Sequence, residues 1–191
     1  MKTGIPIIIS APSGAGKTTI IGLLMKKMKA LAYSVSGTTR PPAGKEKNGI
    51  DYFFITKKEF LQKKKQGKFI ETAVVHGQRY GTFKEQLDRK LKSGRDVILD
   101  IDVVGALNVK KQYPRAFLIF IAAPSMEILR DRMRKRRRDT EKDITRRLKN
   151  AKKEMRYRKF YDSIIVNDKL REALRELIKI IKKIKEGEKC R

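Results

Sequence analysis

The residues best suited to chemistry lie in one short segment near the N-terminus. Residues 11–18 read APSGAGKT, which matches the phosphate-binding pattern G-x-x-x-x-G-K-[ST] except that alanine replaces the first glycine. Gly14 and Gly16 allow successive backbone N–H groups to turn inward and form an anion-binding concavity at the start of a helix. Lys17 would place a cation on the β- and γ-phosphates of a nucleotide, and the Thr18 hydroxyl is suited to bind Mg²⁺.

The apolar pattern around this segment predicts the elements that must hold it. Ile5–Ser10 is a continuous, largely β-branched run, which is typical of a parallel strand buried on both faces. Lys17–Ala30 carries apolar residues at helical spacing. A chance glycine turn in a basic protein is the alternative, but the order of strand, turn and helix favours nucleotide binding.

Three later apolar runs predict the rest of the sheet. Val97–Ile101, Phe117–Ile121 and Ile164–Val166 are each followed by a segment with helical periodicity. This alternation predicts an α/β fold with a parallel sheet of the P-loop NTPase type, flanked by helices. Leu170–Ile184 has the pattern of an amphipathic closing helix.

Two stretches interrupt the alternation, at 34–83 and 125–157. The first combines a Pro41-Pro42 turn, alternating aromatic residues and a helix around 57–66, so we expect a small mixed α/β insertion. The second is helical and strongly basic, with seven basic residues among the nine of 130–138. We therefore expect one domain over residues 1–191, with a core formed by 1–33, 84–124 and 158–191.

The composition limits the function without deciding it. Of 191 residues, 48 are Lys or Arg and 21 are Asp or Glu, a formal net charge of +27 that would attract polyanions. Lysine is spread through almost every segment, which suits a solvated surface better than a single binding patch. Because no apolar stretch approaches about 18 residues and no secretory signal is present, we expect a cytoplasmic protein without membrane contact. The single cysteine, Cys190, can close no internal disulfide.

Several separate motifs then occur in a fixed order: SVSGTTRPPAGKEKNGIDYFF at 34–54, FIE at 69–71, YGT at 80–82 and ILDID at 98–102. Together with the phosphate loop, they resemble guanylate kinase, the enzyme family that moves the γ-phosphate of ATP onto GMP. The resemblance covers the chain from about Ile5 to Ile184. It implies a GMP-binding insertion at 34–83, a lid at 125–157, ATP as donor with Mg²⁺, and a monomer or homodimer with no obligatory nucleic acid.

By this resemblance, the acceptor site would recognise the N–H edge of guanine with Glu71 and Asp100. A carboxylate suits this edge because adenine has no N1 proton, and leaving a buried polar group unpaired rejects the wrong base by about 10⁴ or more. Ser36 and Thr82 would lie near guanine O6. Arg40 would present its planar fork to the acceptor phosphate. The implied acceptor set is Ser36, Arg40, Tyr52, Glu71, Tyr80, Gly81, Thr82 and Asp100.

Each of these residues also has an ordinary alternative. Tyr52 and Tyr80 could be sheet aromatics, Glu71 a solvent-facing residue at a strand edge, and Arg40 a surface charge beside a turn. The matching spacing of all of them together favours the site.

The resemblance assigns the donor site to the phosphate loop and to residues far along the chain. Lid arginines would neutralise the charge that spreads over the transferring phosphoryl group, and closure would exclude water. Asn167 would contact the adenine of ATP, with a helix cap as its alternative role. Asp102 would support Mg²⁺ indirectly beside Thr18. The implied donor set is Ala11, Pro12, Ser13, Gly14, Ala15, Gly16, Lys17, Thr18, Thr19 and Asn167. The implied catalytic set is Lys17, Arg40, Arg132, Arg136 and Arg147.

Two positions depart from the family pattern, and two other functions stay open. Ala43 stands where the family usually has a second phosphate-binding arginine, and Lys45 could supply only a point charge, so we expect weaker GMP binding. Val104 stands where glutamine is common. The alternatives are a non-catalytic guanylate-kinase-like module that binds a protein partner, and a basic P-loop protein that binds RNA. The presence of Lys17, Thr18 and the lid arginines favours catalysis over the first, and the RNA-binding alternative leaves the guanine pocket unexplained.

Overall fold

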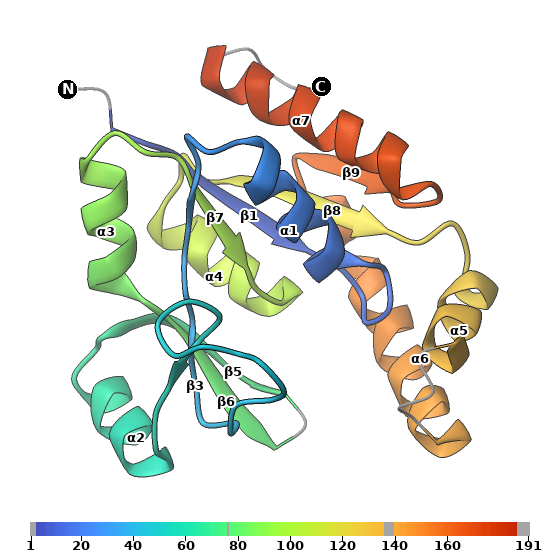
Figure 1. Cartoon of the computed structure of the whole chain (residues 1–191), viewed down its shortest axis with the longest axis horizontal. Helices are drawn as coiled ribbons and strands as arrows, with labels where there is room; N and C mark the ends of the chain where they lie inside the picture. The colour runs from blue at the N-terminus through green and yellow to red at the C-terminus, as the bar shows by residue number, and fades with distance from the viewer. Residues whose placement is uncertain (1–2, 76, 136–139, 187–191) are drawn as a thin grey trace. The chain divides into compact units, whose positions relative to one another are not determined.

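The chain folds around a parallel central sheet flanked by helices (Figure 1). The computed structural model describes residues 3–75, 77–135 and 140–186. The central sheet has the strand order β2-β7-β1-β8-β9. Its strands are β1 (Pro6–Ser10), β2 (Ala32–Tyr33), β7 (Val97–Asp100), β8 (Phe117–Ala122) and β9 (Ser163–Val166). The predicted α/β class is confirmed.

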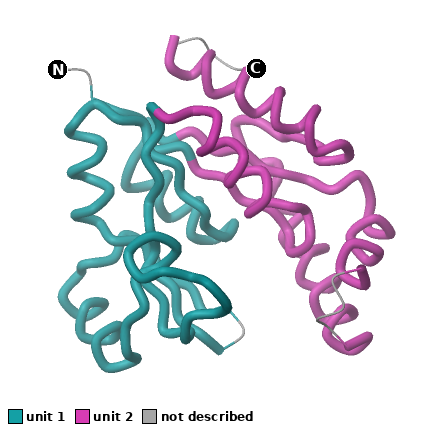
Figure 2. Tube along the Cα trace, viewed as in Figure 1, with its two compact units in different colours: residues 1–7, 30–116 teal, residues 8–29, 117–191 magenta. Residues whose placement is uncertain are grey.

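Two compact units divide the chain: residues 1–7 with 30–116, and residues 8–29 with 117–191 (Figure 2). We call them the first and second unit. The division into core, insertion and lid that we expect from the sequence stays a prediction.

The first unit contains a four-stranded mixed sheet in the order β4-β3-β6-β5. Its strands are β3 (Gly37–Thr38), β4 (Phe53–Phe54), β5 (Phe69–Val75) and β6 (Gln78–Phe83), and its helices are α2 (Lys57–Lys65), α3 (Lys84–Lys92) and α4 (Val103–Gln112). β5 and β6 are antiparallel, with a register shift between Phe69 and Glu71. Of these elements, the four strands and α2 lie within 34–83, where we expect a mixed insertion, whereas α3 and α4 follow it in the chain.

The second unit contains the other helices of the described residues. They are α1 (Lys17–Lys27), α5 (Met126–Lys135), α6 (Glu141–Met155), the 3₁₀ turn η1 (Arg156–Phe160) and α7 (Leu170–Glu186). α1 packs against α7, and α5 packs against α6. The basic segment 125–157 is helical as expected, with two α-helices separated by residues outside the described ranges.

Local sequence explains where several elements begin and end. Ile7, Ile8 and Ile9 of β1 are fully buried, as a continuous β-branched run predicts. α2 begins with a capping box in which Thr56 and Glu59 bond each other's backbone N–H groups. The helix that we expect over 17–30 is shorter, because Met28 leaves the helical conformation at φ −114° and ψ 75°.

None of the helices within residues 3–75, 77–135 and 140–186 has the length and apolar character to cross a lipid bilayer.

An aromatic stack joins α2 to the sheet of the first unit. Phe60 is 1% exposed, and its ring stacks on Phe69 with centroids 4.7 Å apart. Phe69 in turn lies 4.8 Å from Phe83. Phe60 therefore holds the helix against β5, and Phe69 continues the stack to Phe83 at the end of β6.

Replacing Phe60 tests this packing. We expect Phe60→Ala to lower the free energy of unfolding by about 3–5 kcal/mol, because it removes a buried ring and leaves a cavity. Leu61→Ala is the matched control, since Leu61 is the next residue of α2 and is 43% exposed. Urea denaturation followed by circular dichroism measures both, and equal stability of the two variants would contradict the packing.

Candidate active site

The phosphate loop connects β1 to α1 and has the backbone that an anion site requires. Gly14 and Gly16 have φ values of 89° and 91°, in the left-handed region that favours glycine. Gly16 caps α1 without any side-chain hydrogen bond in the described chain, and the first turn has no acidic residue. By contrast, α2, α4 and α6 are capped by side chains, from Thr56, Asp102 and Thr140. The start of α1 is therefore open to an external anion.

Asn167 holds the loop from the other end of the chain. Its side-chain nitrogen donates to the backbone oxygen of Ala15 at 2.7 Å, and the residue is 4% exposed. A Cβ atom at Gly16 would lie 2.6 Å from that nitrogen, so position 16 needs glycine for space as well as for conformation. This contact gives Asn167 a positioning role that the sequence did not reveal. Its predicted contact with adenine stays a prediction.

Two of the predicted lid arginines contact the same part of the second unit. Arg147 Nε donates to Ser13 Oγ in the loop at 3.1 Å. Arg132 Nη2 donates to the backbone oxygens of Asn167 at 2.8 Å and Asp168 at 3.2 Å. The third, Arg136, lies outside the described residues. The second unit thus brings together the loop, Asn167 and two arginines from α5 and α6.

Apolar packing accounts for the alanine at the first position of the loop motif. Ala15 belongs to a buried cluster with residues of α5 and α6, and Ala11 packs against this cluster. The methyl group of Ala11 therefore contributes contacts that glycine could not make. Of the other loop residues, Thr18 and Thr19 are exposed at the start of α1.

Glu71 lies buried on β5 in the first unit, 7% exposed. Thr82, its register partner on β6, donates its hydroxyl to Glu71 Oε1 at 2.7 Å. The alternative of a solvent-facing Glu71 is therefore wrong. A hydroxyl has one proton to donate, so in this arrangement Thr82 stabilises the carboxylate rather than donating to another group. Gly81 beside it gives space to the ring of Phe69, whose Cδ1 would lie 2.8 Å from a Cβ at position 81.

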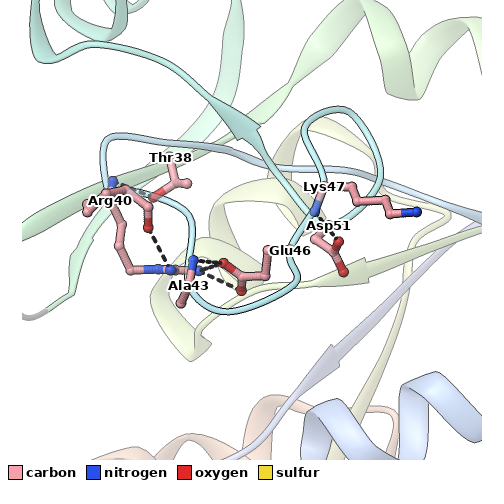
Figure 3. Close-up of polar contacts among 7 residues, drawn as sticks. Thr38, Arg40, Ala43, Glu46, Lys47 and Asp51 are labelled. Atoms are coloured by element: carbon pink, nitrogen blue, oxygen red, sulfur yellow. Dashed lines mark hydrogen bonds and ion pairs between the residues drawn. The ribbon is translucent and has the colours of Figure 1, made fainter.

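Arg40 is held by a carboxylate that sequence reasoning missed. Figure 3 shows Glu46 facing the guanidinium, with Nη2 2.8 Å from both carboxylate oxygens. Glu46 Oε2 also accepts from the backbone N–H of Ala43 at 2.8 Å. Burial opposes the charged form of Arg40, but hydrogen bonds to Glu46 and Tyr80 raise its pKa above the ordinary value. Lys45, which we considered as a substitute cation, is exposed.

Aromatic rings surround the same guanidinium. The Arg40 Cζ atom lies 5.4 Å from the ring centroid of Tyr52 and 5.9 Å from that of Phe54. The rings of Tyr52 and Tyr80 meet edge to face at 5.9 Å. Arg40 is therefore an ordered group beside both predicted tyrosines, not a loose surface charge.

Asp100, at the end of β7, affects two tyrosines of the first unit. Burial, and then the charge of Asp100, raises the pKa of Tyr33 and of Tyr52. The sequence did not predict Tyr33 as a neighbour of the site, because a single tyrosine in the short strand β2 belongs to no recognisable motif. Ser36 is half-buried, and its backbone oxygen accepts from Phe53 N at 2.9 Å.

The residues predicted to assist Mg²⁺ do not form a metal site by themselves. Asp102 caps α4, accepting from Gly105 N at 2.7 Å. In the described part of the chain, no three His, Cys, Asp or Glu side chains gather closely enough to hold a metal ion. Mg²⁺ commonly keeps several waters and binds through few protein groups plus substrate phosphates, so the exposed Thr18 hydroxyl at the open end of α1 fits that role.

Comparison with known proteins identifies the family. The family model described as guanylate kinase matches residues 3–184. The chain belongs to the guanylate kinase family. It is 45% identical over 175 residues to a guanylate kinase of Thermotoga maritima, covering 92% of this chain and 84% of that relative. It is 43% identical over 190 residues to one of Caldanaerobacter subterraneus, covering 100% of this chain and 90% of the relative.

A solved structure agrees with this guanylate kinase assignment. The crystal structure of guanylate kinase from Anaplasma phagocytophilum matches with a TM-score of 0.78 at 31% identity, over 95% of this chain and 86% of that one. The family that we expect from the sequence motifs is confirmed. The roles of the individual site residues stay predictions.

The contact between Asn167 and the loop yields a direct test. We expect Asn167→Asp to lower the free energy of unfolding by about 1–3 kcal/mol, because a buried carboxylate would face the Ala15 carbonyl with no proton to share. Added ATP should also raise the melting temperature less than in the wild type. Asp168→Asn is the control, because Arg132 uses only the backbone oxygen of this exposed neighbour. A wild-type thermal shift with ATP in Asn167→Asp would contradict the positioning role.

Proposed function

We propose that the chain transfers the γ-phosphate of ATP to GMP, giving ADP and GDP. The observation that carries the proposal is the buried Glu71 carboxylate in the same unit as the ordered Arg40. A base-reading anion and a phosphate-binding cation in one unit suit a nucleoside monophosphate. The phosphate loop of the second unit suits the triphosphate of the donor.

On this proposal, the donor is held mainly by backbone groups. The N–H groups at the open start of α1 bind the phosphates, Lys17 adds a cation, and Asn167 keeps the loop in shape. Mg²⁺ would be held by the Thr18 hydroxyl together with the substrate phosphates, with indirect support from Asp102, and it would supply neutralisation of the charge that develops during transfer. Arg132, Arg136 and Arg147 would stabilise the charge on the transferring group, which is greater in the transition state than in the ground state.

The acceptor is held by side chains that select it. Glu71 and Asp100 would accept the N1–H and N2–H₂ groups of guanine, and Ser36 would lie near O6. Arg40, Tyr52 and Tyr80 would bind the phosphate. Since that phosphate is already an anion near neutral pH, the protein needs to align it and neutralise charge, and no general base is required.

The competing functions explain less of the chain. A module that binds only a protein partner would not need Gly14 and Gly16 in left-handed conformations at an uncapped helix start. An RNA-binding protein would not need a buried carboxylate at Glu71. We further propose that the enzyme acts in the cytoplasm as a monomer or homodimer without nucleic acid.

Replacing Glu71 tests the acceptor assignment. We expect Glu71→Gln to lower kcat/KM for GMP by about 100-fold or more, because its amide turns N–H donors toward the donors of guanine. Glu85→Gln, an exposed glutamate on α3, is the matched control and should change little. A coupled assay of ADP release with GMP and AMP as acceptors measures both. A Glu71→Gln protein with wild-type kcat/KM for GMP would refute the acceptor site.

The same assay tests the donor side with Lys17→Ala. Turnover should fall sharply, whereas Lys26→Ala, on an exposed position of α1, should retain it. Unaltered turnover without Lys17 would refute the donor site.

A further inference from the structure

Gly105 lies against the buried carboxylate of the acceptor site. It is a buried residue in the first turn of α4, and α4 packs against β5, which carries Glu71. A Cβ atom built at Gly105 would lie 2.9 Å from Glu71 Oε2 and 3.2 Å from Glu71 Cδ. It would also lie 3.3 Å from Asp102 Oδ1. The position therefore lacks the space for even one methyl group beside Glu71.

The helix itself does not call for glycine at this position. Gly105 does not have the left-handed φ of the loop glycines, so alanine could adopt its backbone conformation. In a helix, glycine is less favourable than alanine by about 1 kcal/mol. Its backbone N–H donates to Asp102, as that of any residue except proline could. The space required by Glu71 is the feature that distinguishes glycine from alanine here.

A methyl group at position 105 would move Glu71 more than it would move the fold. The closest atom is at the far end of a flexible side chain, which can turn away without a backbone shift. The other carboxylate oxygen is held by Thr82 at 2.7 Å, so turning away strains or breaks that buried bond. The displaced carboxylate would no longer stand where two guanine N–H groups can reach it.

We propose that Gly105 is a positioning residue that sets the place of the Glu71 carboxylate and thereby the selectivity for GMP. This inference rests on the proposed function, since it names how the acceptor pocket is kept open. Gly105 touches no reacting atom and acts only through Glu71. The role predicts an effect on acceptor binding without a matching effect on the donor.

Steady-state kinetics of Gly105→Ala test the proposal. We expect KM for GMP to rise by about tenfold or more, because a hydrogen bond to a charged group is lost, while KM for ATP stays at the wild-type value. The preference for GMP over AMP should fall by a similar factor. The matched control is Gly22→Ala, an exposed helical glycine in α1 for which no described atom lies within 4 Å of the added Cβ. It should keep both KM values and melt no lower than the wild type.

A double variant covers the case in which Gly105→Ala folds poorly. Glu71→Asp withdraws the carboxylate by one methylene group, so in Gly105→Ala/Glu71→Asp the clash is relieved. We expect the effects of the two changes on kcat/KM for GMP to be less than additive, and any loss of melting temperature in Gly105→Ala to be recovered. Additive losses, or a melting temperature that stays low, would overturn the proposal.

The outcomes separate this inference from the proposed function. A wild-type chain that releases no ADP with GMP would refute the proposed function. An active wild type together with a folded Gly105→Ala protein of unchanged KM for GMP would refute only the role of Gly105.

Discussion

On the proposed function, the burial of the Glu71 carboxylate is the constraint on which the acceptor site depends. Removing a carboxylate from water is unfavourable by several kcal/mol unless it is paired and hydrogen-bonded. The β5–β6 register places the Thr82 hydroxyl against it. Guanine would supply further N–H donors. The same hydrogen bonds would therefore identify the base and offset the unfavourable burial of the carboxylate. Such a site binds bases that carry N–H donors on this edge more tightly than bases of similar size and shape that lack them.

The donor site follows a different physical principle. On the proposed function it would use backbone N–H groups at a helix start without a side-chain cap, which bind phosphate whatever base is attached. Side chains give this site its shape, through the hydrogen bond from Asn167 to Ala15 and the apolar packing from α5 and α6, while Lys17 and the arginines would add positive charge. On the proposed function, the first unit would select the acceptor through side chains, and the second would bind phosphates mainly through its backbone. The Arg40–Glu46 contact lies in the first unit, as does Ala43, where the family pattern predicts a second cation.

The sequence predicted best where neighbouring residues determine the structure. The strand, glycine turn and helix at residues 5–27 follow from local pattern and backbone sterics, as do the capped helices. The missed features depend on residues far apart in the chain. Asn167 contacts Ala15 across 152 residues. The sequence left Glu71 open between the acceptor pocket and a solvent-facing strand edge, and the structure shows it buried on a strand against which β6 and α4 pack. The sequence did not predict the role of Glu46, because a single carboxylate in a loop of prolines and lysines forms no motif. Its contact with Arg40 is visible only in the folded chain.

If a buried carboxylate recognises the N–H edge of the acceptor base, affinity for the acceptor must follow the number of N–H donors on that edge. Isothermal titration of the wild-type chain with GMP, IMP and AMP tests it directly, because IMP lacks the N2 amino group and AMP also lacks the N1 proton. Affinity should fall in the order GMP, IMP, AMP, with each lost donor weakening binding roughly tenfold or more. Equal affinity for GMP and AMP would contradict it.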